Sequence, residues 1–437
     1  MIAQIFQDAF SPEWVKTHVP NPTHDLIILR PLIPWQSIMD GLIPFYSASK
    51  GRTGCDLRTL SAVSILARLR GLSDRKVIEG IQENRYMQYF CNVPDSSLMT
   101  FMDPSTLCRF RKRVGDSGIA IIEEQVFNRL NWAKVIDPEM MLQDSTVLES
   151  PIIYPTDVRL LYQAFTKMAI VATRVQTKPW WDESEIKKLW RAYHLDKSKQ
   201  YLSYLCALYL HFEPALETFA PLVDGLPDGR VKTKGQQLLE TLLILDEQTQ
   251  LKLEGQLQIP DRLVSLDDVD ARPIQKGKRH PKTEFGTFLQ LSFNRQGFMI
   301  TTENFIGKVD DKILYPNTLE RFQKRMATYP RDAVTDSGYR SAKNLKLHLE
   351  DLDSVFMGQS SDVDESQKEA CISARSATEG FIAVAKNLRG FRKSLYRNLE
   401  GAKIWTRLNQ CAYNLKKFLQ LYRDEALSEA TLVALQL

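Results

Sequence analysis

The sequence has neither a long apolar run nor closely spaced cysteines. No stretch of about 18 or more apolar residues occurs among its 437 residues, so we expect no membrane-spanning helix. The first residues, MIAQIFQDAFSPEW, lack the basic region and cleavage site that a signal peptide needs. The six cysteines form no CxxC pair, which favours buried thiols in a reducing cytoplasm over a zinc site or a disulfide framework.

Basic and acidic residues are nearly balanced, since the formal net charge is only +4. Its distribution is uneven, however. Residues 375–423 contain 11 Lys and Arg against two acids, and residues 50–115 contain 12 against 6. Residues 137–270 contain 14 against 21. Two basic regions on either side of an acidic one suit a polyanionic partner such as nucleic acid.

Short helices are predicted after a proline-rich arm that covers residues 1–50. LRTLSAVSILARLRG favours one helix, Ser73 can cap a second, and a third begins at Asp103. The third helix places four basic side chains close together: Arg109, Arg111, Lys112 and Arg113. They suit either a helix-turn-helix-like module that contacts DNA phosphates or the exposed face of a helical bundle.

Strand-like segments begin at Met140 and are interrupted by a long helical block. MMLQ and TVLE flank Asp144, whose carboxylate is costly inside a strand unless it is paired or metal-bound; a turn between two short strands would also accommodate it. Residues 158–259 are predicted to form a helical insertion. TFLQLSFNRQGFMITTENFIG then predicts two antiparallel strands, and two later strands end at Asp336 and Gln359.

The segment from Cys371 to Arg392 is predicted to be a helix that carries one carboxylate between two cations. Arg375, Glu379 and Lys386 fall within about 40° of one another on a helix that turns 100° per residue. Taken alone, this pattern is typical of a solvated surface ion pair. The opposite face is expected to be a core stripe made by Ile372, Phe381, Ile382 and Leu388.

Three acids stand out once the insertion is set aside: Asp144, Asp336 and Glu379. A sheet can bring acids of its first and fourth strands together at one edge. Clustered carboxylates repel one another and need a cation, and oxygen ligands select Mg²⁺ or Mn²⁺. Two such ions can activate a water or a hydroxyl for phosphodiester displacement. Other acids are expected to be structural (Asp157) or solvated in a loop (Asp310 and Asp311).

Taken in order, QDSTVLE, EFGTFLQLSF, AVTDSGY and R-x3-E-x6-K resemble the DDE transposases of bacterial insertion sequences, which have a ribonuclease-H-like core. The resemblance extends from about residue 56 to residue 421. It implies that Asp144, Asp336 and Glu379 are the catalytic residues and bind two Mg²⁺ (or Mn²⁺) ions. Ile372 stands where the family signature has a tyrosine, so the phosphate contact of that hydroxyl is absent or made by another residue.

The resemblance also implies contacts to DNA phosphates beside the scissile bond from Arg375 and Lys386. Cations beyond them would extend the phosphate track or form an ordinary exposed helix face. The remaining side chains assigned to DNA lie at the end of this helix, in the third N-terminal helix and in a basic loop. They are Arg389, Arg392, Lys393, Arg109, Arg111, Lys112, Arg113, Lys276, Lys278 and Arg279.

The implied fold class is α/β, with a ribonuclease-H-like mixed five-stranded sheet, an all-helical insertion after the first strand and a helical N-terminal DNA-binding domain. We expect a catalytic domain made of two segments and a C-terminal helix after it. The boundaries are 1–136 for the N-terminal domain, 137–157 with 260–405 for the catalytic domain, 158–259 for the insertion and 406–437 for the C-terminal helix.

The implied function is metal-dependent nicking of DNA at transposon ends followed by strand transfer into target DNA. The expected partners are the terminal inverted repeats, target DNA and a second copy of the chain in a synaptic complex, with no membrane. A cytoplasmic, nucleoid-associated location in a bacterium follows. The alternative is a catalytically inactive, transposase-derived DNA-binding or scaffold protein. A plain ribonuclease-H-like nuclease would not account for the two extra helical regions.

Overall fold

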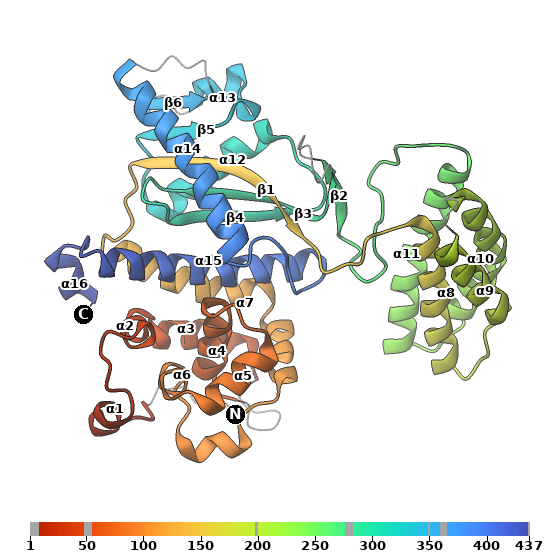
Figure 1. Cartoon of the computed structure of the whole chain (residues 1–437), viewed down its shortest axis with the longest axis horizontal. Helices are drawn as coiled ribbons and strands as arrows, with labels where there is room; N and C mark the ends of the chain where they lie inside the picture. Colours follow the sequence, from red (N-terminus) through yellow and green to blue (C-terminus); the bar gives the residue numbers. More distant parts are fainter. Residues whose placement is uncertain are drawn as a thin grey trace. The chain divides into compact units, whose positions relative to one another are not determined.

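In the computed structural model, the chain folds into two compact units (Figure 1). Unit one combines Met1–Leu148 with Phe288–Leu437, and unit two is the intervening segment Glu149–Thr287. The N-terminal helices, most of the sheet and the C-terminal helices therefore belong to one unit, and no boundary between compact units falls at residue 136. The structure describes residues 8–47, 55–196, 200–275, 283–347, 350–358 and 365–435.

Helices form the N-terminal part of unit one, and polar caps fix several of their starts. Ser73 accepts a hydrogen bond from the Lys76 amide at 3.3 Å, which confirms its predicted capping role. The helix predicted after Ser73 breaks at Asn84, which caps the second half. The elements are α1 (Pro12–His18), α2 (Asp25–Leu29), η1 (Arg30–Leu32), α3 (Trp35–Leu42), η2 (Ile43–Phe45), α4 (Leu57–Leu69), α5 (Asp74–Glu83), α6 (Arg85–Cys91), η3 (Asp95–Thr100) and α7 (Pro104–Trp132).

α4 lies at the centre of these helices and is buried along its whole length. The long helix α15 (Asn398–Arg423) packs against α4 and α7, and also against β4 (Met299–Phe305). The guanidinium of Arg68 in α4 lies 4.3 Å from the ring centre of Trp405 in α15, and Arg407 of α15 forms an ion pair of 2.6 Å with Asp116 of α7. α15 therefore joins the N-terminal helices to the sheet.

A six-stranded mixed sheet has the order β2-β3-β1-β5-β6, and β4 also pairs with β3. β1, β5 and β6 are parallel, whereas β2 and β4 each run antiparallel to β3. The predicted α/β class and the first strand at Met140 are confirmed. β2 was not predicted, because its residues were assigned to a polar loop. The remaining bounds are β1 (Met140–Glu149), β2 (Arg272–Gln275), β3 (Thr283–Phe293), β5 (Asp332–Thr335) and β6 (Ser354–Met357).

α14 (Glu365–Leu388) crosses one face of the sheet (Figure 1). Its side chains that pack into the sheet core are Cys371, Ala374 and Ala385, with Phe381 and Ile382 partly buried beside them. The predicted core stripe is therefore only half right. Ile372 and Leu388 are 50% and 66% exposed, because small side chains, rather than large apolar ones, make much of the helix–sheet contact.

Four shorter elements complete unit one, and two of them lie close to β1 and β5. Gln143 of β1 donates to the hydroxyl of Thr318 at 3.1 Å, so α12 packs on the face of β1 to which Gln143 points. Asp310 caps α12 through the Lys312 amide. These elements are α12 (Asp311–Met326), η4 (Ser337–Tyr339), α13 (Ala342–Lys346) and α16 (Glu429–Leu435).

Unit two contains a helical bundle with its own apolar core, and the predicted insertion 158–259 lies inside it. Phe165, Phe212 and Phe219 are among the buried side chains at its centre. Asp157 is buried and forms an ion pair of 2.6 Å with Arg262, which confirms the structural role expected of it. The helices are α8 (Asp157–Arg174), α9 (Glu183–Leu195), α10 (Tyr201–Asp224) and α11 (Arg230–Leu253).

All six cysteines lie in the described part of the chain, and none is in a disulfide. Cys91, Cys371 and Cys411 are buried as expected, whereas Cys206 is exposed. Within the described ranges, no single helix has both the length and the apolar character that a membrane span requires. The bent pair formed by Asp25–Leu32 and Trp35–Phe45 satisfies that test by length and composition alone.

Candidate active site and nucleic-acid interface

Asp144 and Asp336 occupy matching positions on two neighbouring parallel strands. The pairing of β1 with β5 ends with Leu142 opposite Val334, and each acid lies two residues further along its own segment. Because side chains alternate along a strand, both carboxylates belong to the same face as Leu142 and Val334. Both side chains are half-buried. The register therefore brings Asp144, in the middle of β1, beside Asp336, which directly follows β5.

A third acid, Asp311, faces Asp336 across Gly338. Asp336 caps η4, and its Oδ1 accepts a hydrogen bond from the Gly338 amide at 2.9 Å. A Cβ at Gly338 would lie 3.0 Å from Asp336 Oδ1 and 3.3 Å from Asp311 Oδ2. Asp311 is the first residue of α12 and is half-buried. The expectation that it is solvated in a loop is therefore corrected. Asp310 is exposed, as expected.

Tyr339 supplies a neutral hydroxyl beside these acids. Its ring is fully buried, and its hydroxyl donates to Gln290 Oε1 at 3.1 Å. Burial raises the pKa of Tyr339 well above its usual value, and the negative charges of Asp144 and Asp311 raise it further. The phenol therefore stays protonated and remains a hydrogen-bond donor near neutral pH.

Glu379 is exposed on the part of α14 that lies near the amino-terminal ends of β1 and β5. Earlier in α14, Cys371 lies near Asp332 at the start of β5, since burial and then the charge of that carboxylate raise the pKa of the thiol. Later in α14, Phe381 lies against Phe293, and a Cβ at Gly297 in the β3–β4 turn would be 2.7 Å from its ring. Both contacts lie at the amino-terminal ends of β1 and β5, so the exposed Glu379 is not beside Asp144 and Asp336.

The donor chemistry of Asp144 and Asp336 fits a hard divalent cation, because both offer carboxylate oxygens at one strand edge. The complete set predicted from the sequence is not assembled, since Glu379 is elsewhere. Across the residues that the structure describes, no group of three or more His, Cys, Asp or Glu side chains is arranged to hold a metal ion. The described conformation therefore presents part of a candidate metal site.

Most of the basic side chains predicted to contact DNA are at the surface. Lys386 and Arg389 are half-buried. Lys276, Lys278 and Arg279 lie outside the described residues. The exposed members are Arg109, Lys112, Arg113, Arg375, Arg392 and Lys393.

Arg111 is the exception, and its expected exposure is corrected. Arg111 is only 8% exposed, and its guanidinium donates two hydrogen bonds to the carboxylate of Asp74 in α5, at 3.1 and 2.5 Å. Its guanidinium also lies 4.3 Å from the ring centre of Tyr396. Arg111 therefore holds helices together inside unit one and is not part of the exposed basic surface.

Sequence reasoning missed the contribution of Asp311, Tyr339 and Gln290 to the acidic edge. Asp311 opens a helix far along the chain from Asp144, and no local pattern links the two. Tyr339 did carry a signal, because it follows Asp336 in the TDSGY motif. Its burial beneath the acids, and its partner Gln290 on β3, depend on the strand order and could not be deduced from spacing.

The first part of the chain matches a known protein family. Residues 13–113 match the model of a transposase domain (DUF772). A protein of Rhizobium meliloti named "Uncharacterized protein ORF8 in nfe locus" is 30% identical over 147 residues, which are 33% of this chain and 70% of that protein. No solved structure matches the chain significantly. Since this match covers more than two thirds of the relative, and the family model describes a transposase domain, the chain belongs to a transposase family.

Proposed function

We propose that this protein is a DDE transposase that nicks DNA at the ends of an insertion sequence and joins the freed 3′-hydroxyl to target DNA. The register of β1 and β5 carries the proposal. It supports Asp144 and Asp336 as neighbours on adjacent parallel segments, in a chain whose N-terminal part matches a transposase domain. The order β3-β1-β5-β6, with β4 beside β3, is consistent with a ribonuclease-H-like core.

In this proposal Asp144, Asp336 and Glu379 would hold Mg²⁺ (or Mn²⁺), which when bound would supply Lewis acidity to the attacking and leaving oxygens. Tyr339 holds its proton beside the acidic edge and donates it in a hydrogen bond to Gln290. Arg375 and Lys386, which flank Glu379 on α14, would contact phosphates near the scissile bond. Their charges would offset the repulsion between the DNA backbone and the acidic edge.

The proposal requires α14 to shift when DNA binds, because Asp144, Asp336 and Glu379 are not arranged to hold a metal ion in the part of the chain that the structure describes. The exposed position of Glu379 leaves its carboxylate available for such a rearrangement. Paired transposon ends would be held by two copies of the chain in a synaptic complex. The protein would accordingly act at the nucleoid, in the cytoplasm of a bacterium.

Replacement of either aspartate tests the catalytic assignment. We expect Asp144→Asn and Asp336→Asn to reduce nicking roughly a hundredfold to a thousandfold, the scale on which the loss of one electrostatic contact to a transition state acts. Asn keeps the shape of the side chain and, at position 336, the helix-capping oxygen. The measurement is Mg²⁺-dependent nicking of a duplex that carries the DNA flanking the reading frame, together with its binding by the same variants.

Asp310→Asn is the matched control, because Asp310 also caps a helix in the same region but is exposed. It should nick at the parent rate. Glu379→Gln should behave like the aspartate variants if α14 moves as proposed. Nicking that survives in Asp144→Asn would contradict the assignment, as would loss of duplex binding in that variant.

A catalytically inactive DNA-binding protein is the second candidate, and the position of Glu379 favours it. If the arrangement of α14 is retained on DNA, the third acid never reaches the other two. The parent protein would then bind the flanking duplex without nicking it at any Mg²⁺ or Mn²⁺ concentration. Strand-transfer products from the parent protein would exclude this candidate.

A further inference from the structure

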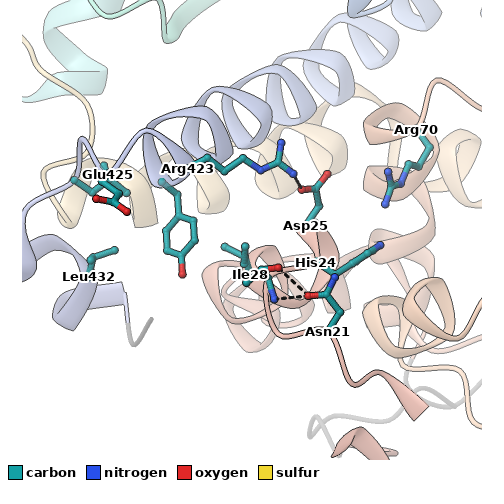
Figure 2. Close-up of a pocket in the computed structure, with 11 residues that line it drawn as sticks. Asn21, His24, Asp25, Ile28, Arg70, Arg423, Glu425 and Leu432 are labelled. Atoms are coloured by element: carbon teal, nitrogen blue, oxygen red, sulfur yellow. Dashed lines mark hydrogen bonds and ion pairs between the residues drawn. The ribbon is translucent and has the colours of Figure 1, made fainter. Parts of the chain in front are cut away.

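A pocket of about 840 Å³ opens in unit one where three segments distant in sequence meet (Figure 2). One wall comes from the start of α2 and the residues before it, a second from Arg70 at the end of α4, and a third from the end of α15. Asn21, His24, Asp25, Arg70, Tyr422 and Arg423 supply most of its polar lining. None of these residues belongs to the acidic edge of the sheet.

Two arginines line this pocket, and two further cations lie near them. Arg70 and Arg423 line it directly. Lys416 lies about two turns before Arg423 on α15. Burial and the charges of Arg70 and Arg389 lower the pKa of Lys416, whereas the charge of Asp25 raises it. Arg389 is therefore close to Lys416, which links the pocket to the end of α14. Cations brought together in this way repel one another, and a bound anion would relieve that repulsion.

The acids of the pocket do not neutralise these cations fully. Asp25 pairs with Arg423 and also with Lys416, at 3.6 Å in the second pair. Glu425 is the other acid in the lining. Within the described part of the chain, neither Arg70 nor Arg389 has a carboxylate within ion-pair distance. Figure 2 shows the guanidinium of Arg70 apart from the Asp25–Arg423 pair.

His24 adds a neutral donor to the pocket. Its Nδ1 accepts a hydrogen bond from the Leu26 amide at 3.2 Å, so the ring proton of the neutral form is on Nε2. Burial and then the charge of Arg70 lower the pKa of His24, which keeps the ring neutral near pH 7. A pocket with several cations and a neutral N–H group suits a phosphodiester, since phosphate oxygens accept from both kinds of donor.

We propose that Arg70, Arg389, Lys416 and Arg423 form a phosphate-binding surface for the backbone of double-stranded DNA, separate from the acidic edge. This inference rests on the proposed function for the identity of the polyanion. The surface includes Arg389, which directly follows the end of α14. The backbone would therefore run from the end of α14 across Lys416 to the pocket, and each cation would fix its position without reading sequence.

Substitution of the cations tests the surface in the full-length protein. Each phosphate contact that is lost should reduce the slope of log K against log salt by about 0.9 and weaken binding roughly fivefold to tenfold near 0.1 M salt. We expect this from Arg70→Ala and from Arg389→Ala, measured by fluorescence anisotropy with a labelled duplex of random sequence. Neither side chain has an ion-pair partner among the described residues, so these variants should keep the parent melting temperature.

Lys188→Ala is the control, because Lys188 is an exposed cation of unit two with a 77% exposed side chain. It should leave affinity and salt slope unchanged. Asp25→Asn should tighten binding, since it removes the acid that pairs with Arg423 and Lys416. Parent-like affinity and slope in an Arg70→Ala Arg389→Ala double variant would overturn the proposal. Asp144→Asn, which changes the acidic edge and not this surface, should keep the parent affinity and salt slope while losing nicking, so failure here is distinguishable from failure of the catalytic assignment.

Discussion

At the scale of single residues, the surroundings of an arginine decide its role more than its place in a basic run. Arg109, Arg111, Lys112 and Arg113 are consecutive or nearly so, yet only Arg111 points into the protein. The 100° turn of the helix directs it toward Asp74 and Tyr396, whereas its neighbours point to solvent. A basic cluster in sequence therefore contains both a structural ion pair and candidate phosphate contacts.

We predict that Arg111→Ala destabilises the protein by about 2 kcal/mol. Loss of one partner of a buried ion pair costs roughly 3 to 5 kcal/mol, and the partial exposure of Asp74 lowers that figure. Arg109→Ala should change stability by less than about 0.5 kcal/mol, because its side chain is exposed. Urea unfolding of the two variants measures the difference. Equal free energies of unfolding for Arg111→Ala and Arg109→Ala would show that the contact of Arg111 with Asp74 contributes nothing to stability.

His24 gives a prediction on pH. Its pKa in the folded protein is below the usual value of 6.5, because burial and Arg70 disfavour the charged ring. The unfolded chain therefore binds a proton more readily than the folded one, so the stability that depends on His24 is present above pH 6.5 and is lost as pH falls below it. His24→Asn keeps an N-cap acceptor but cannot titrate.

The melting temperature of the parent should consequently fall more steeply than that of His24→Asn between pH 6.5 and 5. Above pH 7 the two should change in parallel, since the ring is neutral in both the folded and unfolded states. Thermal unfolding followed by circular dichroism at a series of pH values provides the comparison. Parallel curves over the whole range would mean that the Leu26 amide and Arg70 do not bias the protonation of the ring.

At the scale of elements, α14 shows what helical periodicity can and cannot predict. The sequence correctly predicted a helix with Arg375, Glu379 and Lys386 away from the sheet core. It did not predict that Cys371 and Ala374 would be buried in place of Ile372 and Leu388, because side-chain size at a close helix–sheet contact matters as much as hydrophobicity. Nor could it predict how far along the sheet the helix lies, which decides where Glu379 is placed.

The positions of the strand residues were easier to predict than that of α14, because backbone pairing fixes which residues of neighbouring strands lie side by side. Asp144 and Asp336 were predicted to meet at one edge, and the parallel pairing of β1 with β5 brings them there. Asp311 joins them through α12, whose place depends on packing against β1 and β4. β2 was missed for a related reason. Its residues pair only with the first part of β3, across a loop whose polar composition concealed the strand.

At the scale of the whole molecule, the first and last thirds of the chain fold as one unit. Three contacts described above, Arg68 with Trp405, Arg407 with Asp116 and Asp25 with Arg423, join residues that are hundreds of positions apart. Composition and local patterns could divide the chain into helical and mixed segments, but they carry no record of such pairings. This is why the sequence suggested a separate N-terminal domain where the structure has shared packing.

Unit two is the part that should be separable. Its bundle has a core of its own, and both ends of the segment meet, since the Ser150 amide donates to the Phe285 carbonyl at 2.9 Å. We predict that a polypeptide of residues 149–287 folds alone and unfolds in one cooperative thermal transition. Circular dichroism and amide hydrogen exchange would test this, with strong protection expected in α8 and α10, which supply most of the buried core.

The complementary protein, with residues 149–287 replaced by a short Gly/Ser linker, should keep the DNA affinity of the parent. The proposed phosphate surface, the acidic edge and α14 all belong to unit one, and unit two has no net charge, with 19 Lys and Arg against 19 Asp and Glu. A variant that folds but binds the duplex much more weakly would show that unit two contributes contacts to DNA.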